Sequence, residues 1–189
     1  MEQKIEWETD MHVALKRARE ENKPMLLDFF NPGWIGCQQM DAVTYPDSGV
    51  TSFINEHMVP VRIAFDAEPH AKDFNVKWTP TIITLDNEGK EHHRTLGFLA
   101  PEDLVASLLL GMGKINFDTD EFDDALVNLD RVTSDYSKSN SAPEAIFFWG
   151  VSGYKSSHDP KKLKEAYERL QAEYPGSEWT KRAYPYRLI

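Results

Sequence analysis

Residues 24–40 read P-M-L-L-D-F-F-N-P-G-W-I-G-C-Q-Q-M, and this stretch decides the fold. Met25 to Phe30 is an apolar run that is interrupted by a single acid, Asp28. The next three residues, N-P-G, favour a turn, and the residues after them are compatible with a helix that carries the chain's only cysteine, Cys37. The stretch therefore predicts a buried strand, a tight turn and the start of a helix.

Two further stretches extend this pattern. Residues 5–24 begin with I-x-W and continue with A-L-x-x-A-x-x-x-N-K-P, and residues 76–81 read V-x-x-T-P-T. With the first stretch, they resemble the thioredoxin superfamily, in particular its branch with a helical lead-in and a C-x-x-C-[K/Q]-x-M motif. In that family the first cysteine follows the strand aspartate by six residues, and the second follows three residues later.

The register places an indole at the first cysteine position. Counted from Asp28, that position falls on Trp34 and the second falls on Cys37, and the C-Q-Q-M spacing gives the same register. A dithiol enzyme needs an exposed thiolate at a helix N-terminus and a second thiol one turn later. Cys37 can take only the second role, so we expect it to be buried and less acidic than a nucleophile. One cysteine cannot form an intramolecular disulfide.

The order of expected elements gives an α/β thioredoxin fold over residues 1–111. A helix ending at Glu21 with Asp10 as its N-cap precedes the strand at residues 25–30. We expect a helix at residues 49–57, a strand at 59–65, a hairpin whose strands are 82–85 and 92–96, and a helix at 100–110 that ends near Gly111.

The second motif implies a substrate groove. In the resembling family the proline of T-P-T, here Pro80, is cis and faces the C-x-x-C motif, and the backbone of the preceding residue, Thr79, can pair with an extended peptide. Trp78, Thr79 and Pro80 are therefore the candidate substrate-binding residues, and the expected partner is a protein or a peptide. The alternative is a proline that only begins an edge strand.

Asp28 has two interpretations. An unpartnered carboxylate within an apolar strand is costly, so it should be protonated or paired. The resemblance implies that it exchanges protons with Cys37. The other interpretation is a strand-end residue bonded to the backbone. Arg62 falls near the position of a basic partner of this acid in the family, but we expect a solvated strand residue there.

We expect residues 112–189 to form an all-helical, repeat-like extension. Expected helices lie around residues 117–132, 143–156, 161–174 and 178–183, and their small and aromatic residues resemble about one and a half tetratricopeptide repeats. We expect the tail aromatics to be core residues. These are Phe147, Phe148, Trp149, Tyr154 and Tyr167.

Composition excludes several classes of function. The 189 residues carry a formal net charge of −10, which argues against nucleic acid and against an anionic membrane surface. Without a spanning apolar segment or a signal-type core, the expected location is cytoplasmic. We expect no cofactor, because there is no phosphate-binding loop or hydrolase elbow. We also expect no metal site, because His92 and His93 alternate on a strand.

Three hypotheses of activity remain open. In the first, Trp34 replaces a cysteine or selenocysteine of the active protein. The retention of the surrounding motif residues motivates this hypothesis, and the tryptophan codon is one base from those of both; the retained residues are Asp28, Cys37, Met40, Thr79 and Pro80. In the second, the chain is a non-catalytic binding module in which Trp34 anchors a partner at the groove. In the third, Cys37 performs monothiol chemistry such as glutathionylation, which its expected burial disfavours.

Overall fold

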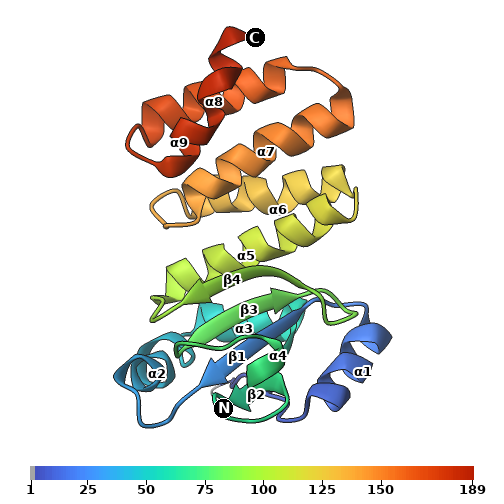
Figure 1. Cartoon of the computed structure of the whole chain (residues 1–189), viewed down its shortest axis with the longest axis vertical. Helices are drawn as coiled ribbons and strands as arrows, with labels where there is room; N and C mark the ends of the chain where they lie inside the picture. The colour runs from blue at the N-terminus through green and yellow to red at the C-terminus, as the bar shows by residue number, and fades with distance from the viewer. Residues whose placement is uncertain (1–2) are drawn as a thin grey trace. The chain divides into compact units, whose positions relative to one another are not determined.

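The computed structural model describes residues 3–189, which fall into two compact units. The first unit ends at Gly111 and the second begins at Met112. The first contains a four-stranded mixed sheet with the strand order β2-β1-β3-β4 (Figure 1). Its strands are β1 (Met25–Phe30), β2 (Val59–Ala64), β3 (Thr81–Leu85) and β4 (Glu91–Leu96). The sheet is flanked by helices, which confirms the predicted α/β class.

The strand pairing brings distant stretches of sequence together. Strand β1 runs parallel to β2 and antiparallel to β3, and β4 pairs with β3 in antiparallel fashion. In the β1–β2 register, Asp28 lies opposite Arg62. The sheet therefore places the buried acid of the central strand beside the only basic residue of β2.

Between residue 3 and β3 the chain forms four helices and one π-helical turn. They are α1 (Met11–Glu21), α2 (Ile35–Gln39), the π-helix η1 (Met40–Thr44), α3 (Ser48–His57) and α4 (His70–Asp73). The carboxylate of Asp10 accepts hydrogen bonds from the N–H groups of His12 at 2.8 Å and Val13 at 3.0 Å. This confirms Asp10 as the N-cap of α1.

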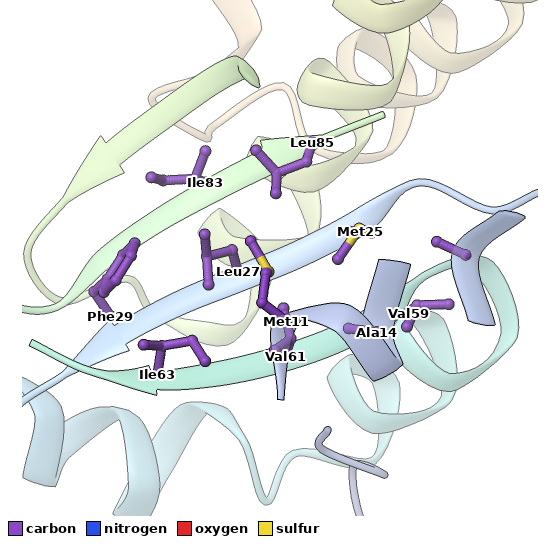
Figure 2. Close-up of a cluster of buried hydrophobic side chains, with 11 residues drawn as sticks. Met11, Ala14, Met25, Leu27, Phe29, Val59, Val61, Ile63, Ile83 and Leu85 are labelled. Atoms are coloured by element: carbon purple, nitrogen blue, oxygen red, sulfur yellow. The ribbon is translucent and has the colours of Figure 1, made fainter. Parts of the chain in front are cut away.

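One face of the sheet packs against α1. Figure 2 shows the alternate residues of β1 gathered with those of β2 and β3 beneath the apolar side of this helix. The cluster comprises Met11, Ala14, Ala18, Met25, Leu27, Phe29, Val59, Val61, Ile63, Ile83 and Leu85. Because successive side chains of a strand point to opposite faces, Asp28 lies on the face away from α1.

Helix α5 (Pro101–Asp118) corrects the predicted helix end near Gly111. Glycine commonly marks a helix terminus, but here it lies inside the helix. A Cβ added to Gly111 would lie 2.4 Å from Oγ1 of Thr84 and 2.7 Å from its Cβ. Gly111 therefore lets the helix approach β3 closely, and the helix continues for seven residues beyond it.

The second unit is helical within the part that the structure describes. After the end of α5 come α6 (Phe122–Asp135), α7 (Ala142–Ser157), α8 (Lys161–Glu173), α9 (Glu178–Ala183) and the 3₁₀ helix η2 (Tyr184–Leu188). Ile146, Ala166, Leu170 and Ala183 form its buried cluster, with Phe147, Trp149 and Tyr167 packed against it. Tyr154 is exposed, which corrects its predicted core position.

Over residues 3–189, no helix combines the length with the apolar composition that crossing a bilayer requires.

Candidate functional site

The turn after β1 is fixed by hydrogen bonds from its own residues. The Asn31 side chain accepts a bond from the Gly33 N–H at 3.0 Å, and the Asn31 carbonyl accepts one from the Trp34 N–H at 3.0 Å. The Gln38 side chain returns to donate to the Pro32 carbonyl at 3.1 Å. These bonds place Trp34 at the N-cap of α2, and the Trp34 side chain makes no capping bond there.

Cys37 lies in the middle of α2 and is only 1% exposed. Burial raises the pKa of its thiol, and the negative charge of Asp28 raises it further. The Asn31 N–H, 3.3 Å from Sγ, and the Thr79 side chain oppose this increase in pKa by hydrogen bonding to the sulfur. The burial and reduced acidity that the sequence predicts for Cys37 are thus both found.

Trp34 and Trp78 form an exposed aromatic pair. Their ring centroids are 5.5 Å apart, and the ring planes meet at 83°, the edge-to-face arrangement that aromatic rings prefer. Trp34 is 41% exposed and Trp78 is 52% exposed. The indole at the first cysteine position therefore contacts the loop that carries the T-P-T motif.

Pro80 lies where three segments of the chain meet. The Thr79–Pro80 peptide bond is cis. A Cβ added to Gly36 would lie 3.0 Å from Cδ of Pro80, so α2 approaches the proline as closely as a glycine allows. The Pro80 carbonyl accepts a hydrogen bond from the Gly97 N–H at 2.8 Å. The structure thus brings the W-I-G-C stretch, T-P-T and the end of β4 together.

A buried polar network surrounds Asp28 on the face away from α1. The hydroxyl of Tyr45 and Nε of Arg62 both donate to Oδ2 of Asp28, each at 2.9 Å. Nη1 of Arg62 lies 2.8 Å from Oδ1 of Asp41. Oδ1 of Asp28 and Nη2 of Arg62 are buried with no hydrogen-bond partner within the described chain.

Burial raises the pKa of Asp28 to about 6, although the Arg62 cation and the Tyr45 hydroxyl both favour its ionised form. Desolvation therefore outweighs the two partners. The pKa of the carboxyl group therefore lies in the slightly acidic range, and the group is near enough to Cys37 to affect the thiol. Such a group is chemically suited to hold or release a proton at the sulfur.

The network corrects the expectation for Arg62 and excludes one of the two interpretations of Asp28. Arg62 is not a solvated strand residue, because its side chain is largely buried and paired with two carboxylates. Asp28 is not a strand-end residue bonded to the backbone, because it lies within β1 and bonds to side chains. The structure thus places Arg62 beside Asp28.

Among residues 3–189, no three His, Cys, Asp or Glu side chains gather closely enough to hold a metal ion. His92 pairs with Asp86 at 2.8 Å, and His93 lies 3.1 Å from Oγ of Ser107. The two histidines thus have different partners.

The comparison with protein families agrees with this geometry. The family described as "Thioredoxin-like domain" matches residues 11–110, which is more than half of the chain. The chain belongs to this family. The match covers β1, α2 and the T-P-T loop, which carry the sequence resemblance.

Curated thioredoxin-like relatives are much longer than this chain. The thiol:disulfide interchange protein DsbD of Escherichia coli K12 is 30% identical over 105 residues, which cover 52% of this chain and 18% of DsbD. The protein of the same name from Ralstonia nicotianae is 25% identical over 116 residues, covering 59% of this chain and 19% of the relative. The matched segment thus spans about a fifth of these relatives.

Two solved structures support the thioredoxin-like fold. A proposed disulphide-isomerase from Bacteroides thetaiotaomicron has a TM-score of 0.52 and 24% identity, with 59% of this chain and 95% of that chain covered. A thioredoxin from Thermus thermophilus has a TM-score of 0.50 and 22% identity, with 56% and 85% covered. At these identities the likeness shows the fold alone.

The predicted site residues lie in one region of this thioredoxin-like unit. Tyr45 and Asp41 lie there too, although neither was predicted from the sequence. Their positions depend on η1, which continues directly from α2 and turns both residues toward Arg62 and Asp28. No signal in the sequence pointed to either residue, because both contacts depend on the π-helical turn, which the residues M-D-A-V-T do not predict.

Proposed function

We propose that this chain is a thioredoxin-like protein of the thiol-disulfide oxidoreductase lineage in which Trp34 occupies the position of the attacking thiol, so that dithiol exchange is impaired. One observation carries the proposal. The residue at the N-cap of α2 is an exposed indole, and the single sulfur available for exchange belongs to buried Cys37.

Dithiol exchange needs two thiols. An exposed thiolate attacks the substrate disulfide to form a mixed disulfide, and a second thiol then attacks that bond and releases the reduced substrate. An indole cannot form the mixed disulfide. Cys37 is placed for the second step, with Asp28 available to take its proton, and has no first step to complete.

Substitution Trp34→Cys should therefore create disulfide reductase activity. Two thiols of the variant would be oxidised to an internal disulfide while an insulin disulfide is reduced to two thiols, with dithiothreitol reducing the variant again. We expect turnover above the uncatalysed rate for Trp34→Cys and none for the unsubstituted chain. Insulin precipitation measures turnover, and thiol titration before and after oxidation measures the disulfide.

Two variants control this experiment. Trp34→Ser removes the indole without adding a thiol, and Trp34→Cys with Cys37→Ser adds the first thiol without the second. Both should lack turnover. The proposal would be wrong if the unsubstituted chain reduced insulin as fast as Trp34→Cys, or if a folded Trp34→Cys formed no internal disulfide.

A second candidate function is a protein-binding module that uses the same groove. It is supported by the exposed Trp34–Trp78 pair beside Pro80. Residues 31–40 and 95–101 contain no charged side chain, in a chain of which 28% is charged. Exposed indoles beside these two uncharged stretches suit an extended segment of a partner protein.

Reduced and alkylated insulin B chain is a suitable probe for this candidate, because it has no reactive sulfur. We expect it to shift the indole N–H signals of Trp34 and Trp78 in NMR spectra and to leave that of Trp149 unchanged. Trp78→Ala should weaken binding about tenfold, the loss expected for a modest aromatic contact. Unchanged indole signals with this probe and with a pool of uncharged heptapeptides would reject the candidate.

The helical unit is a further part of the proposal. We propose that α6 to α8 are tetratricopeptide-like, on the basis of their small-residue pattern. Gly150 of α7 supports this, because an added Cβ would lie 2.4 Å from Cβ of Ala166 in α8, so that the two helices meet at small residues. The proposed location is cytoplasmic.

A further inference from the structure

The π-helical turn η1 links the helix of Cys37 to the buried acid. Helix α2 ends at Gln39 and η1 begins at Met40 without a break, so Cys37 and Asp41 lie on one continuous helical run. A π-helical turn is uncommon and is frequently found at functional sites. Here it presents Asp41 to Arg62, and the residue after it, Tyr45, to Asp28.

The guanidinium of Arg62 is held at two of its nitrogens. Nε donates to Asp28 at 2.9 Å, and Nη1 lies 2.8 Å from Asp41. The ring of Phe30 has its centroid 4.4 Å from the guanidinium carbon, and those of Trp7 and Tyr45 are at 5.5 and 5.3 Å. Because a guanidinium is planar, fixing Nη1 also fixes the direction in which Nε points.

Asp41 does not itself need Arg62 to neutralise its charge. Its side chain is 49% exposed, whereas that of Asp28 is 1% exposed, so Asp41 could remain hydrated in the absence of a cation. We propose that Asp41 is a positioning residue that directs the Arg62 guanidinium at Asp28, and thereby couples the helical run of Cys37 to the charge state of the buried acid. This inference goes beyond the proposed function, because it concerns the control of Asp28 rather than the identity of the attacking group.

Removal of the Asp41 charge shows whether Asp41 acts on Asp28 by directing Arg62 or only through its own negative charge. The negative charge of Asp41 by itself disfavours ionisation of Asp28 and raises its pKa. If Asp41 acted only as a charge, Asp41→Asn would therefore lower the pKa of Asp28. If Asp41 directs Arg62, the same substitution removes the charge that holds Nη1 and weakens this contact, so that the guanidinium is less firmly directed at Asp28 and the pKa of Asp28 rises.

The experiment is a pH titration followed by carbon NMR on the full chain labelled at aspartate carboxyl carbons. The charged and titratable groups around Asp28 are Arg62 from β2, Asp41 and Tyr45 from the turn, and Cys37 from α2. A second label, at the Cβ of cysteine, follows Cys37 in the same titration. It gives one signal, because Cys37 is the only cysteine of the chain. Asp28→Asn assigns the carboxyl signal.

We expect Asp41→Asn to move the titration midpoint of Asp28 upward by about one pH unit, the low end of the effect of a nearby opposite charge. Arg62→Gln should move it upward further. The matched control is Asp66→Asn, which removes the same charge from an exposed position after β2 and should leave the midpoint unchanged.

A downward or absent shift in Asp41→Asn would overturn the inference. Asparagine is nearly isosteric with aspartate at this half-exposed position, so the variant should fold, and the dispersion of the other aspartate signals shows whether it does. The readout involves no substrate. A failure here therefore leaves the proposal for Trp34 untouched, and inactivity of Trp34→Cys would leave this inference untouched.

Discussion

Substitution Arg62→Met should lower the free energy of unfolding by about 3–5 kcal/mol at pH 7, as expected when one partner of a buried ion pair is removed. Arg62 is the cation that contacts Asp28, and its guanidinium also lies against the ring of Phe30. Methionine keeps an apolar side chain of similar length, so the loss reports the charge and its hydrogen bonds. Urea unfolding monitored by circular dichroism measures it.

A second substitution tests the cause of this loss. Without Arg62, the ionised form of Asp28 is buried without a cation, so Arg62→Met combined with Asp28→Leu should regain most of the lost stability. The loss in the single variant should also shrink at pH 5, because Asp28 then becomes protonated. Equal losses in the single and the double variant would mean that packing, rather than the pair, determines the cost.

The strands and the first helix could be predicted because their signals are local. The apolar run before N-P-G defines β1, and the side chain of Asp10 caps α1 through its nearest neighbours. The spacing from Asp28 was enough to place Trp34 and Cys37 on the turn and on α2. In each case the residues that decide the structure are close together in the sequence.

The remaining features depend on contacts between distant residues. In the sequence, Arg62 resembles an ordinary strand residue. Only the pairing of β2 with β1 shows that it lies opposite Asp28. Gly111 reads as a helix end, although the close approach of α5 to Thr84 makes it an interior residue. The sequence M-D-A-V-T carries no recognisable signal for the π-helical turn, so the roles of Asp41 and Tyr45 became visible only in three dimensions.

Asp28 should make stability fall as the pH rises through the slightly acidic range. Its pKa is about 6 in the folded chain, above the ordinary value of 3.8, so the folded state binds its proton more tightly than the unfolded state does. The contribution of Asp28 to the free energy of unfolding is fully present below pH 3.8 and is lost as the pH rises through 6. This difference in pKa corresponds to about 3 kcal/mol of unfolding free energy.

Other carboxylates act in the opposite direction, because the pKa values of Glu21 and Asp86 are lowered in the folded chain. The measurement must therefore compare the chain with Asp28→Asn, whose side chain does not titrate. In urea unfolding between pH 4 and 8, the stability of the native chain relative to Asp28→Asn should fall by about 2 kcal/mol, most of the full contribution. Asp66→Asn, which alters an exposed acid, should show no such change. A difference that stayed constant across this range would mean that Asp28 keeps its ordinary pKa despite its burial, and that Arg62 and Tyr45 fully offset the cost of desolvation.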